Sequence, residues 1–324
     1  MDAPNAFNSL PKEIFANIIE NSDIYAIENI CSVSQNMCGT INIRNILLNR
    51  LKETNDNLDV QNYSTKELIR YSKIQPLKDY IGAGFGERAI YVYPDNKTIK
   101  FYDQTVEMGI EINQIMEFYN KPVLLTAEGK LYILNGNWKI INIENVCSIS
   151  NSLVPPNNGL VILTKTGLSY IMQEKEIKKI EEPKDIIQIR SQFRLTDKGE
   201  VYSNLTKIEQ LPRIVQITDP GIVLSADGKV FMINRETLTV KKLNDVENIV
   251  QIASTITHYR SVIGYGLNLN GDIINLFDVK YRTEGDYKRV VNYSDSFYGV
   301  TFDDKLIRVK NIIAYSYSDL QRNT

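Results

Sequence analysis

Residues 213–233, RIVQITDPGIVLSADGKVFMI, contain the two elements that decide the fold. The first is an extended pentapeptide, RIVQI (213–217), of the form x-Φ-Φ-Gln-Φ, where Φ is an apolar residue. The second, IVLSADGKVFMI (222–233), has two apolar runs around a short polar turn. Gly228 stands where a tight β-hairpin needs a positive φ angle, which glycine adopts without a Cβ penalty. The segment therefore predicts a strand followed by an antiparallel hairpin.

Both elements recur along the chain after residue 79. Further pentapeptides are EINQI (111–115), DIIQI (185–189) and NIVQI (248–252), with looser copies at DYIGA (79–83), NVCSI (145–149), RVVNY (289–293) and NIIAY (311–315). Further hairpins lie at 123–134, 161–172, 193–203 and 267–277, with weaker copies at 92–102 and 300–309. Their turns, at 96, 129, 167, 199, 228, 271 and 304, are 29 to 43 residues apart. Seven hairpins thus alternate strictly with eight pentapeptides.

A repeat of this length, with one further short strand such as LTVKKL (238–243), is typical of a four-stranded propeller blade. A blade cannot bury both of its faces alone, but a closed ring of blades buries them and protects their edges. The alternative, a linear β-solenoid, usually has shorter repeats. We therefore expect residues 79–324 to form a seven-bladed β-propeller. The eighth pentapeptide would complete the last blade or pair with the first, near Ile81.

The N-terminal part has a helical period instead, so the fold class is mainly β with a small all-α domain. Apolar stripes run through 14–19, 27–34 and 43–51, and the segment 54–62 is polar. Ser64-x-x-Glu67 has the form of a capping box that begins a short helix. We expect a helical domain over 1–54 and a linker with a short helix over 55–78.

The amino-acid composition limits the classes of function and the cellular compartments to be expected for this chain. The chain is 43% hydrophobic and 23% charged, as expected of a soluble globular protein, and its net charge of −2 argues against broad nucleic-acid binding. No apolar stretch is long enough to span a membrane, and the first residues lack the basic start of a signal peptide. The three cysteines show no paired metal spacing. We therefore expect an intracellular protein, cytoplasmic or nuclear, in a reduced compartment.

No pattern predicts catalysis, a cofactor or a metal. His258 is the single histidine, and we expect it, like Cys31 and Cys38, to be a packing residue. The glycine-rich segment 82–86 precedes a predicted strand rather than a helix, so it is not expected to hold a phosphate. Trp138 is expected to pack in the core or at a blade rim. The chain is accordingly expected not to be an enzyme.

Residues 9–52 resemble an F-box, through Leu10-Pro11-Lys12-Glu13-Ile14 and the central Val33-Ser34-Gln35. The family often has a Leu-Trp pair near its end, where this chain has Leu47-Leu48. The resemblance implies that an apolar helical face docks on the Skp-type adaptor of cullin ubiquitin ligases. The residues that it places on this face are Leu10, Pro11, Ile14, Ile18, Ile30 and Val33.

Residues 79–317 resemble the regulator-of-chromosome-condensation repeats, through IVQIA (249–253) and LNGDI (269–273). The family's Ala-Gly-x-x-His and Gly-Gln-Leu-Gly segments are absent from most blades, so the resemblance implies a fold rather than an activity. Asn, Ile, Lys and Tyr, which have AT-rich codons, are abundant. An F-box before such a propeller, with this composition, resembles the F-box/propeller proteins of giant viruses.

These resemblances imply a non-catalytic adaptor, the substrate receptor of a ubiquitin ligase, whose propeller holds an unidentified target protein. Two rim connections are candidate target-binding loops, because they are proline-stiffened or mix aromatic and basic side chains. Their residues are Val154, Pro155, Pro156, Tyr281, Arg282 and Tyr287. The alternatives are a structural or virion-associated propeller scaffold, and a chromatin- or GTPase-binding regulator.

Overall fold

The structure is a computed structural model with two compact units, residues 1–75 and 76–324. It describes residues 12–22, 24–33, 43–53, 61, 63–73, 82–83, 90–92, 97–101, 104–119, 121–152, 159–173, 176–181, 183–243, 246–256, 261–293, 296–301, 305–309 and 315–316. No helix within these ranges is long and apolar enough to cross a membrane.

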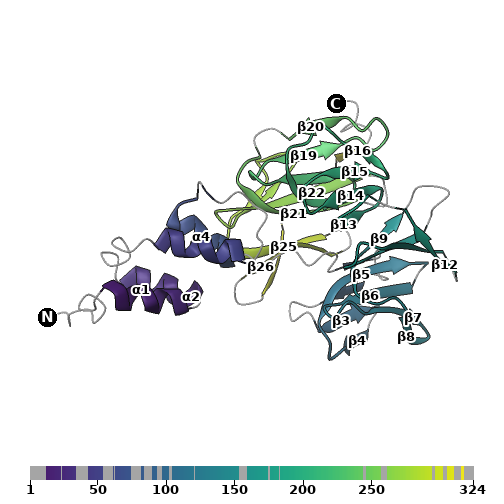
Figure 1. The fold of residues 1–324 in the computed structure, drawn as a ribbon, viewed down its shortest axis with the longest axis horizontal. Coiled ribbons are helices and arrows are strands. Elements are labelled where there is room, and N and C mark those ends of the chain that lie inside the picture. Colours follow the sequence, from purple (N-terminus) through teal and green to yellow (C-terminus); the bar gives the residue numbers. More distant parts are fainter. Residues whose placement is uncertain are drawn as a thin grey trace. The chain divides into compact units, whose positions relative to one another are not determined.

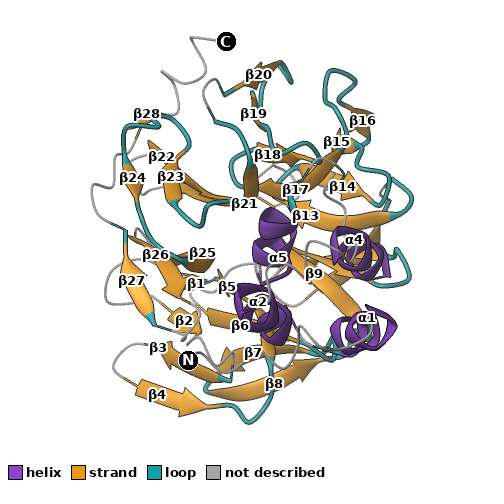
Figure 2. Ribbon diagram, turned by 90° about the vertical axis from the view of Figure 1, so that its left-hand side faces the viewer, coloured by secondary structure: helices purple, strands orange, loops and turns teal. Residues whose placement is uncertain are grey.

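The described part of the first unit contains the helices α1 (Lys12–Asn21), α2 (Ile24–Val33), α4 (Ile43–Glu53) and α5 (Thr65–Lys73) (Figures 1 and 2). All four contribute to its buried apolar core. The core residues are Phe15, Ile19, Ile27, Ile43, Leu47, Leu48, Leu51, Leu68, Ile69 and Tyr71. The apolar periodicity of the sequence is therefore present as helices with a common core.

Helix α5 begins at the predicted capping box. The Ser64 N–H donates to the Glu67 carboxylate (2.6 Å), and the Glu67 N–H donates to Ser64 Oγ (3.3 Å). The hydrogen bonds from Ser64 hold the pKa of Glu67 below its usual value, because they stabilise the ionised carboxylate. We expected this helix in a linker, but it contacts α2 and α4 and so belongs to the helical unit.

An arginine of α4 holds the end of α1. Arg50 donates from its two terminal nitrogens to the carbonyls of Ser22 and Ile19, each at 2.8 Å. These carbonyls lie at the helix C-terminus, where the last turn has no intrahelical donors. The fork of a guanidinium matches this arrangement, so Arg50 fixes α1 against α4.

The described part of the second unit contains seven antiparallel sheets, and all but the sixth are made only from consecutive strands (Figures 1 and 2). The first sheet contains β1 (Gly82–Ala83), β2 (Ile90–Val92), β3 (Thr98–Phe101) and β4 (Gln104–Glu107). The second contains β5 (Ile112–Phe118), β6 (Lys121–Thr126), β7 (Leu131–Asn135) and β8 (Asn137–Ile141). The third contains β9 (Val146–Ser152), β10 (Gly159–Thr164), β11 (Ser169–Gln173) and β12 (Glu176–Ile180). The fourth contains β13 (Ile186–Arg190), β14 (Phe193–Thr196), β15 (Val201–Ser203) and β16 (Thr206–Lys207). The fifth contains β17 (Ile214–Thr218), β18 (Ile222–Ser225), β19 (Val230–Ile233) and β20 (Val240–Lys242). The sixth contains β21 (Ile249–Ile256), β22 (Ser261–Asn268), β23 (Ile273–Asn275) and β24 (Arg282–Thr283), and β28 (Tyr315–Ser316) is added to it beside β22. The seventh contains β25 (Tyr287–Tyr293), β26 (Ser296–Thr301) and β27 (Leu306–Arg308).

The sheets form a closed ring through their first strands. In order, β1, β5, β9, β13, β17, β21 and β25 each contact the next, and β25 contacts β1. The seventh sheet also packs against the first two, because Val300 shares a buried cluster with Ile99 and Ile115. Each sheet is therefore a blade, and the expected β-propeller is present. Trp138, on the edge strand β8, packs against the same cluster, as expected.

The glutamine of the pentapeptide ties four of the blades to the next. The N–H of Ile149 donates to Gln114 Oε1 (2.7 Å), and the same bond joins later blades. The further pairs are Ile217 with Gln188 (2.9 Å), Ile252 with Gln216 (2.9 Å) and Val290 with Gln251 (2.7 Å). Gln216 also donates from Nε2 to the Ile252 carbonyl (2.9 Å). We call the glutamine at the fourth position of the pentapeptide the latch, because its side chain satisfies a main-chain group of the following blade.

The hairpin glycines have the predicted positive φ angles, 76° to 84°, at residues 129, 167, 199, 228 and 271. Four of them also touch the following blade, since their carbonyls accept from the start of its first strand. These bonds join Gly129 to Val146 (3.0 Å), Gly199 to Ile214 (2.9 Å), Gly228 to Ile249 (3.1 Å) and Gly271 to Tyr287 (3.3 Å). The turn therefore needs glycine for its backbone conformation and for its closeness to the next blade.

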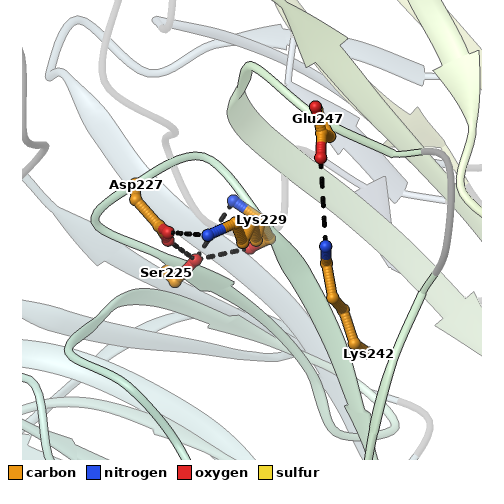
Figure 3. A network of polar contacts seen from close by, with 5 residues as sticks. All are labelled: Ser225, Asp227, Lys229, Lys242 and Glu247. Atoms are coloured by element: carbon orange, nitrogen blue, oxygen red, sulfur yellow. Dashed lines mark hydrogen bonds and ion pairs between the residues drawn. The ribbon is translucent and has the colours of Figure 1, made fainter. Parts of the chain in front are cut away.

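A hydroxyl closes four of the five clear hairpin turns from within, and the Asn268 side chain closes the fifth by accepting from the Asp272 N–H (2.8 Å). In the fifth blade Ser225 Oγ accepts from the Lys229 N–H (3.1 Å) and lies against the Asp227 carboxylate, which pairs with the Lys229 ammonium (Figure 3). Thr126, Thr164 and Thr196 accept equivalent bonds at 3.1 Å. The recurrent Thr or Ser three residues before the glycine is thus part of the turn. Figure 3 also shows the longer pair of Lys242 and Glu247 (3.9 Å), which joins the last strand of this blade to the connection after it.

Two expectations about the last repeats were wrong. In the second to seventh blades the strand register shifts one residue before the latch position, and in the seventh the shift lies between Tyr287 and Arg289. The seventh pentapeptide is therefore DYKRV (286–290), not RVVNY (289–293). Of the eighth pentapeptide the structure describes only Tyr315, which forms β28 with Ser316 and pairs with β22 of the sixth sheet rather than with the last or the first blade.

Candidate functional site

The apolar face predicted to bind an adaptor is partly exposed on α1. Ile14 is 51% exposed and Ile18, one turn later, is half-buried. Phe15 and Ile19 are fully buried in the core of the helical unit. Helix α1 therefore has two apolar faces, and the core uses only one of them.

The other predicted adaptor residues are only partly described. Ile30, on α2, is half-buried, and Val33 is the last residue of that helix. Leu10 and Pro11 lie outside the described residues. The structure thus gives the exposure of three members of the predicted face and leaves adaptor binding itself a prediction.

The second candidate target-binding loop divides into exposed and buried parts. Tyr281 is 37% exposed, and Arg282 is exposed at the outer strand β24, where it forms an ion pair with Glu284 (2.5 Å). Tyr287 is only 5% exposed, because it begins β25 and its ring lies where a Cβ on Gly285 or Gly299 would be. Tyr287 is therefore a core residue and offers no ring to a partner. Val154, Pro155 and Pro156 lie outside the described residues.

Two open grooves, which we did not predict, lie at equivalent places on the third and fourth blades. Their volumes are about 380 and 390 Å³. Thr164 and Tyr170 line the first, and the equivalent Thr196 and Tyr202 line the second. No single motif marks them, because each combines a hairpin turn with the connection that enters the blade.

At the second groove, the carboxylate of the lining residue Glu200 forms a surface ion pair. Lys207 Nζ lies 3.0 Å from the Glu200 carboxylate, and this bond holds the pKa of Glu200 below its usual value. The carboxylate therefore stays ionised near neutral pH and is not poised as an acid. Burial raises the pKa of Tyr202. The groove offers contacts to a partner rather than groups prepared for proton transfer.

The part of the chain that the structure describes contains no site prepared for nucleophilic catalysis or for metal binding. Burial raises the pKa of the Cys147 thiol to about 11, so it is largely protonated at neutral pH. No three described His, Cys, Asp or Glu residues are placed to hold a metal ion.

Cys31 is disulfide-bonded, whereas we expected a reduced packing residue. His258 lies outside the described residues. Gly82 belongs to the strand β1.

The junction between the third and fourth blades lacks the glutamine latch. Ser148 occupies the latch position, and its buried Oγ has no hydrogen-bond partner, because serine is too short to reach the next strand. Instead, the Ser191 N–H donates to Ser150 Oγ (2.7 Å) near the other end of the strands. This junction is therefore joined by a different contact.

No family model matches the chain, and no curated protein matches it either. Solved structures do. The N-terminal domain of BBS1 in complex with ARL6DN gives a TM-score of 0.50 at 12% identity, covering 69% of this chain and 87% of that one. YCF48 bound to a D1 peptide gives 0.45 at 12% identity (74% and 92% covered), and Prp20p from Saccharomyces cerevisiae gives 0.41 at 9% (75% and 84% covered). The likeness to the BBS1 domain supports the β-propeller fold that the sheets themselves show.

Proposed function

We propose that this chain is a non-catalytic adaptor, the substrate receptor of a Skp/cullin-type ubiquitin ligase. The observation that carries the proposal is the second apolar face of α1. Ile14 remains half exposed although the same helix buries Phe15 and Ile19 completely. An exposed apolar strip on a helix suits docking against an apolar groove, in which burial of the strip provides the free energy of binding.

The helical unit holds this strip in a fixed position. Arg50 fixes the end of α1, and the buried core beneath Ile14 sets which face of the helix points outward. A preformed strip loses little conformational entropy on binding. The proposed contact surface combines Ile14, Ile18 and Ile30 with Leu10, Pro11 and Val33.

The propeller is proposed to bind the target protein. The BBS1 propeller, the likeness with the highest TM-score reported above, is described in complex with ARL6DN, so a fold of this kind accommodates a protein partner. Tyr281 and Arg282 at the outer edge of the sixth blade are exposed contacts of suitable chemistry. The proposed location is the cytoplasm or nucleus.

Binding of the purified chain to a eukaryotic Skp adaptor tests the proposal. Ile14→Asp puts a carboxylate into the proposed apolar interface and should weaken binding about a hundredfold or more. Ile140→Asp is the matched control, because Ile140 is a similarly exposed isoleucine (65%) on the propeller.

Binding that Ile14→Asp abolishes and Ile140→Asp preserves would support the receptor role. No binding by a folded wild-type chain, or equal loss in both variants, would refute it. The propeller scaffold would then be the better account.

A further inference from the structure

The latch positions of the ring are not all glutamine. Glutamine occupies them in the second, fourth, fifth and sixth blades, and each bonds to the fifth residue of the next pentapeptide. In the third blade the position is Ser148, whose buried Oγ has no partner. In the first pentapeptide, DYIGA (79–83), it is Gly82, which has no side chain.

Arg289 occupies the latch position of the seventh blade. Its register is that of Gln188 and Gln216, directly after the shift at the start of the first strand. The side chain is 1% exposed, one of the largest to be buried so completely in the described part of the chain. A buried guanidinium requires hydrogen-bond partners, because its desolvation is otherwise very costly.

The blade that follows Arg289 is the first blade, so this junction closes the ring. Strand β25 contacts β1, and Val300 packs against Ile99. Within the described residues no strand passes between the first and the seventh sheets, since each is built from its own consecutive strands. Closure therefore depends on contacts between side chains and on main-chain groups of the two first strands.

We propose that Arg289 is the residue that closes the ring, donating a hydrogen bond to the carbonyl of Ala83. Ala83 is the fifth residue of the first pentapeptide, so it corresponds to Ile252. Gln216 bonds to both main-chain groups of Ile252, accepting from its N–H and donating to its carbonyl. Arginine has only donors, so it can replace the donating half of this pattern but not the accepting half.

The choice of arginine has a consequence for the first blade. Because Gly82 provides no latch toward the second blade, Arg289 would be the only latch at the described residues of the first blade. A hydrogen bond from a charged donor is stronger than one from an amide, which fits a junction held from one side. The closing junction should then open locally when Arg289 loses its donors.

Hydrogen exchange of the full chain tests this inference, with amides followed in β1, β17 and β25. Arg289→Met removes the donors at similar length, and Arg289→Gln restores the residue used at four other junctions. Gln188→Met, which removes the latch between the fourth and fifth blades, is the control. Loss of a charged hydrogen bond should speed exchange in β1 about ten- to a hundredfold in Arg289→Met.

Arg289→Gln should exchange in β1 within a few-fold of the wild type, and Gln188→Met should affect β17 but not β1. Unchanged exchange in β1 of Arg289→Met, beside a clear effect of Gln188→Met on β17, would overturn the proposal. So would equally fast exchange in Arg289→Gln and Arg289→Met. If Arg289→Met does not fold, the comparison of Arg289→Gln with the wild type decides, and rapid exchange in β1 would again overturn it.

Discussion

Gly199→Ala and Gly167→Ala separate the two reasons for which the hairpins need glycine. The two residues have nearly the same φ angle, 80° and 78°. A Cβ on Gly199 would lie 2.5 Å from Arg213 Cγ and 2.7 Å from the Ile214 carbonyl oxygen, both in the next blade. A Cβ on Gly167 would have nothing within 4 Å.

The left-handed backbone costs alanine about 1–2 kcal/mol at either position. At Gly199 the overlap with the Ile214 main chain adds about 1–3 kcal/mol, because the fourth and fifth blades must move apart. Gly199→Ala should therefore lower the free energy of unfolding by about 2–5 kcal/mol, and Gly167→Ala by about 1–2 kcal/mol.

Urea unfolding followed by tryptophan fluorescence and by circular dichroism measures both values, and coincident transitions would justify a two-state analysis of the propeller. Gly136→Ala is a further control, because it also has a positive φ and nothing within 4 Å. Equal destabilisation by Gly199→Ala and Gly167→Ala would refute the reasoning that the turn glycine is needed for contact with the next blade.

Three more predictions follow from single contacts. Gln216→Met removes a doubly bonded latch and leaves two main-chain groups of the next strand unsatisfied, so it should lower the urea midpoint; an unchanged midpoint would count against the latch. Ser148→Gln should slow hydrogen exchange at Ile189 if the longer amide reaches it, and unchanged exchange would show that this junction has no room for a latch. The pKa of Glu67 is lowered in the folded state, so its contribution to stability is present above the usual carboxyl pKa of about 4.3 and lost as the pH falls through the lower folded value. Far-ultraviolet circular dichroism should show helix loss on acidification that Glu67→Gln makes less steep, and identical profiles would contradict the prediction.

The fold could be predicted because its signals are local. A hairpin turn depends on a few consecutive residues, so Gly228 and the apolar runs around it identify one blade without knowledge of the others. The register of the seventh pentapeptide could not be read in this way. Arg289 replaces glutamine there, and the strand that it faces comes from the opposite end of the sequence.

The candidate adaptor face shows the same limit. Residues 14, 15, 18 and 19 form one wide apolar stripe in the sequence, and the helical period does not say which part of it is buried. Packing within the helical unit decides this, since it buries Phe15 and Ile19 completely and leaves Ile14 half exposed. The exposure of Ile14 is therefore a tertiary property. For the same reason the sequence predicts a loop position for Tyr287, an aromatic residue beside a basic pair, although Gly299 makes space for its ring in the core.

The distribution of the latches explains why the repeats vary in length but not in fold. Every described bond of this kind lies between first strands and joins the same two positions of successive pentapeptides. The inner strand pair covers 249–268 in the sixth blade but only 214–225 in the fifth. Gln216 nevertheless meets Ile252 in the usual register. Length can therefore be added beyond the latch, in the connections that face solvent, without disturbing the junctions. The inner strands would then be constrained by closure of the ring, whereas the outer strands and loops would be free to specify a partner.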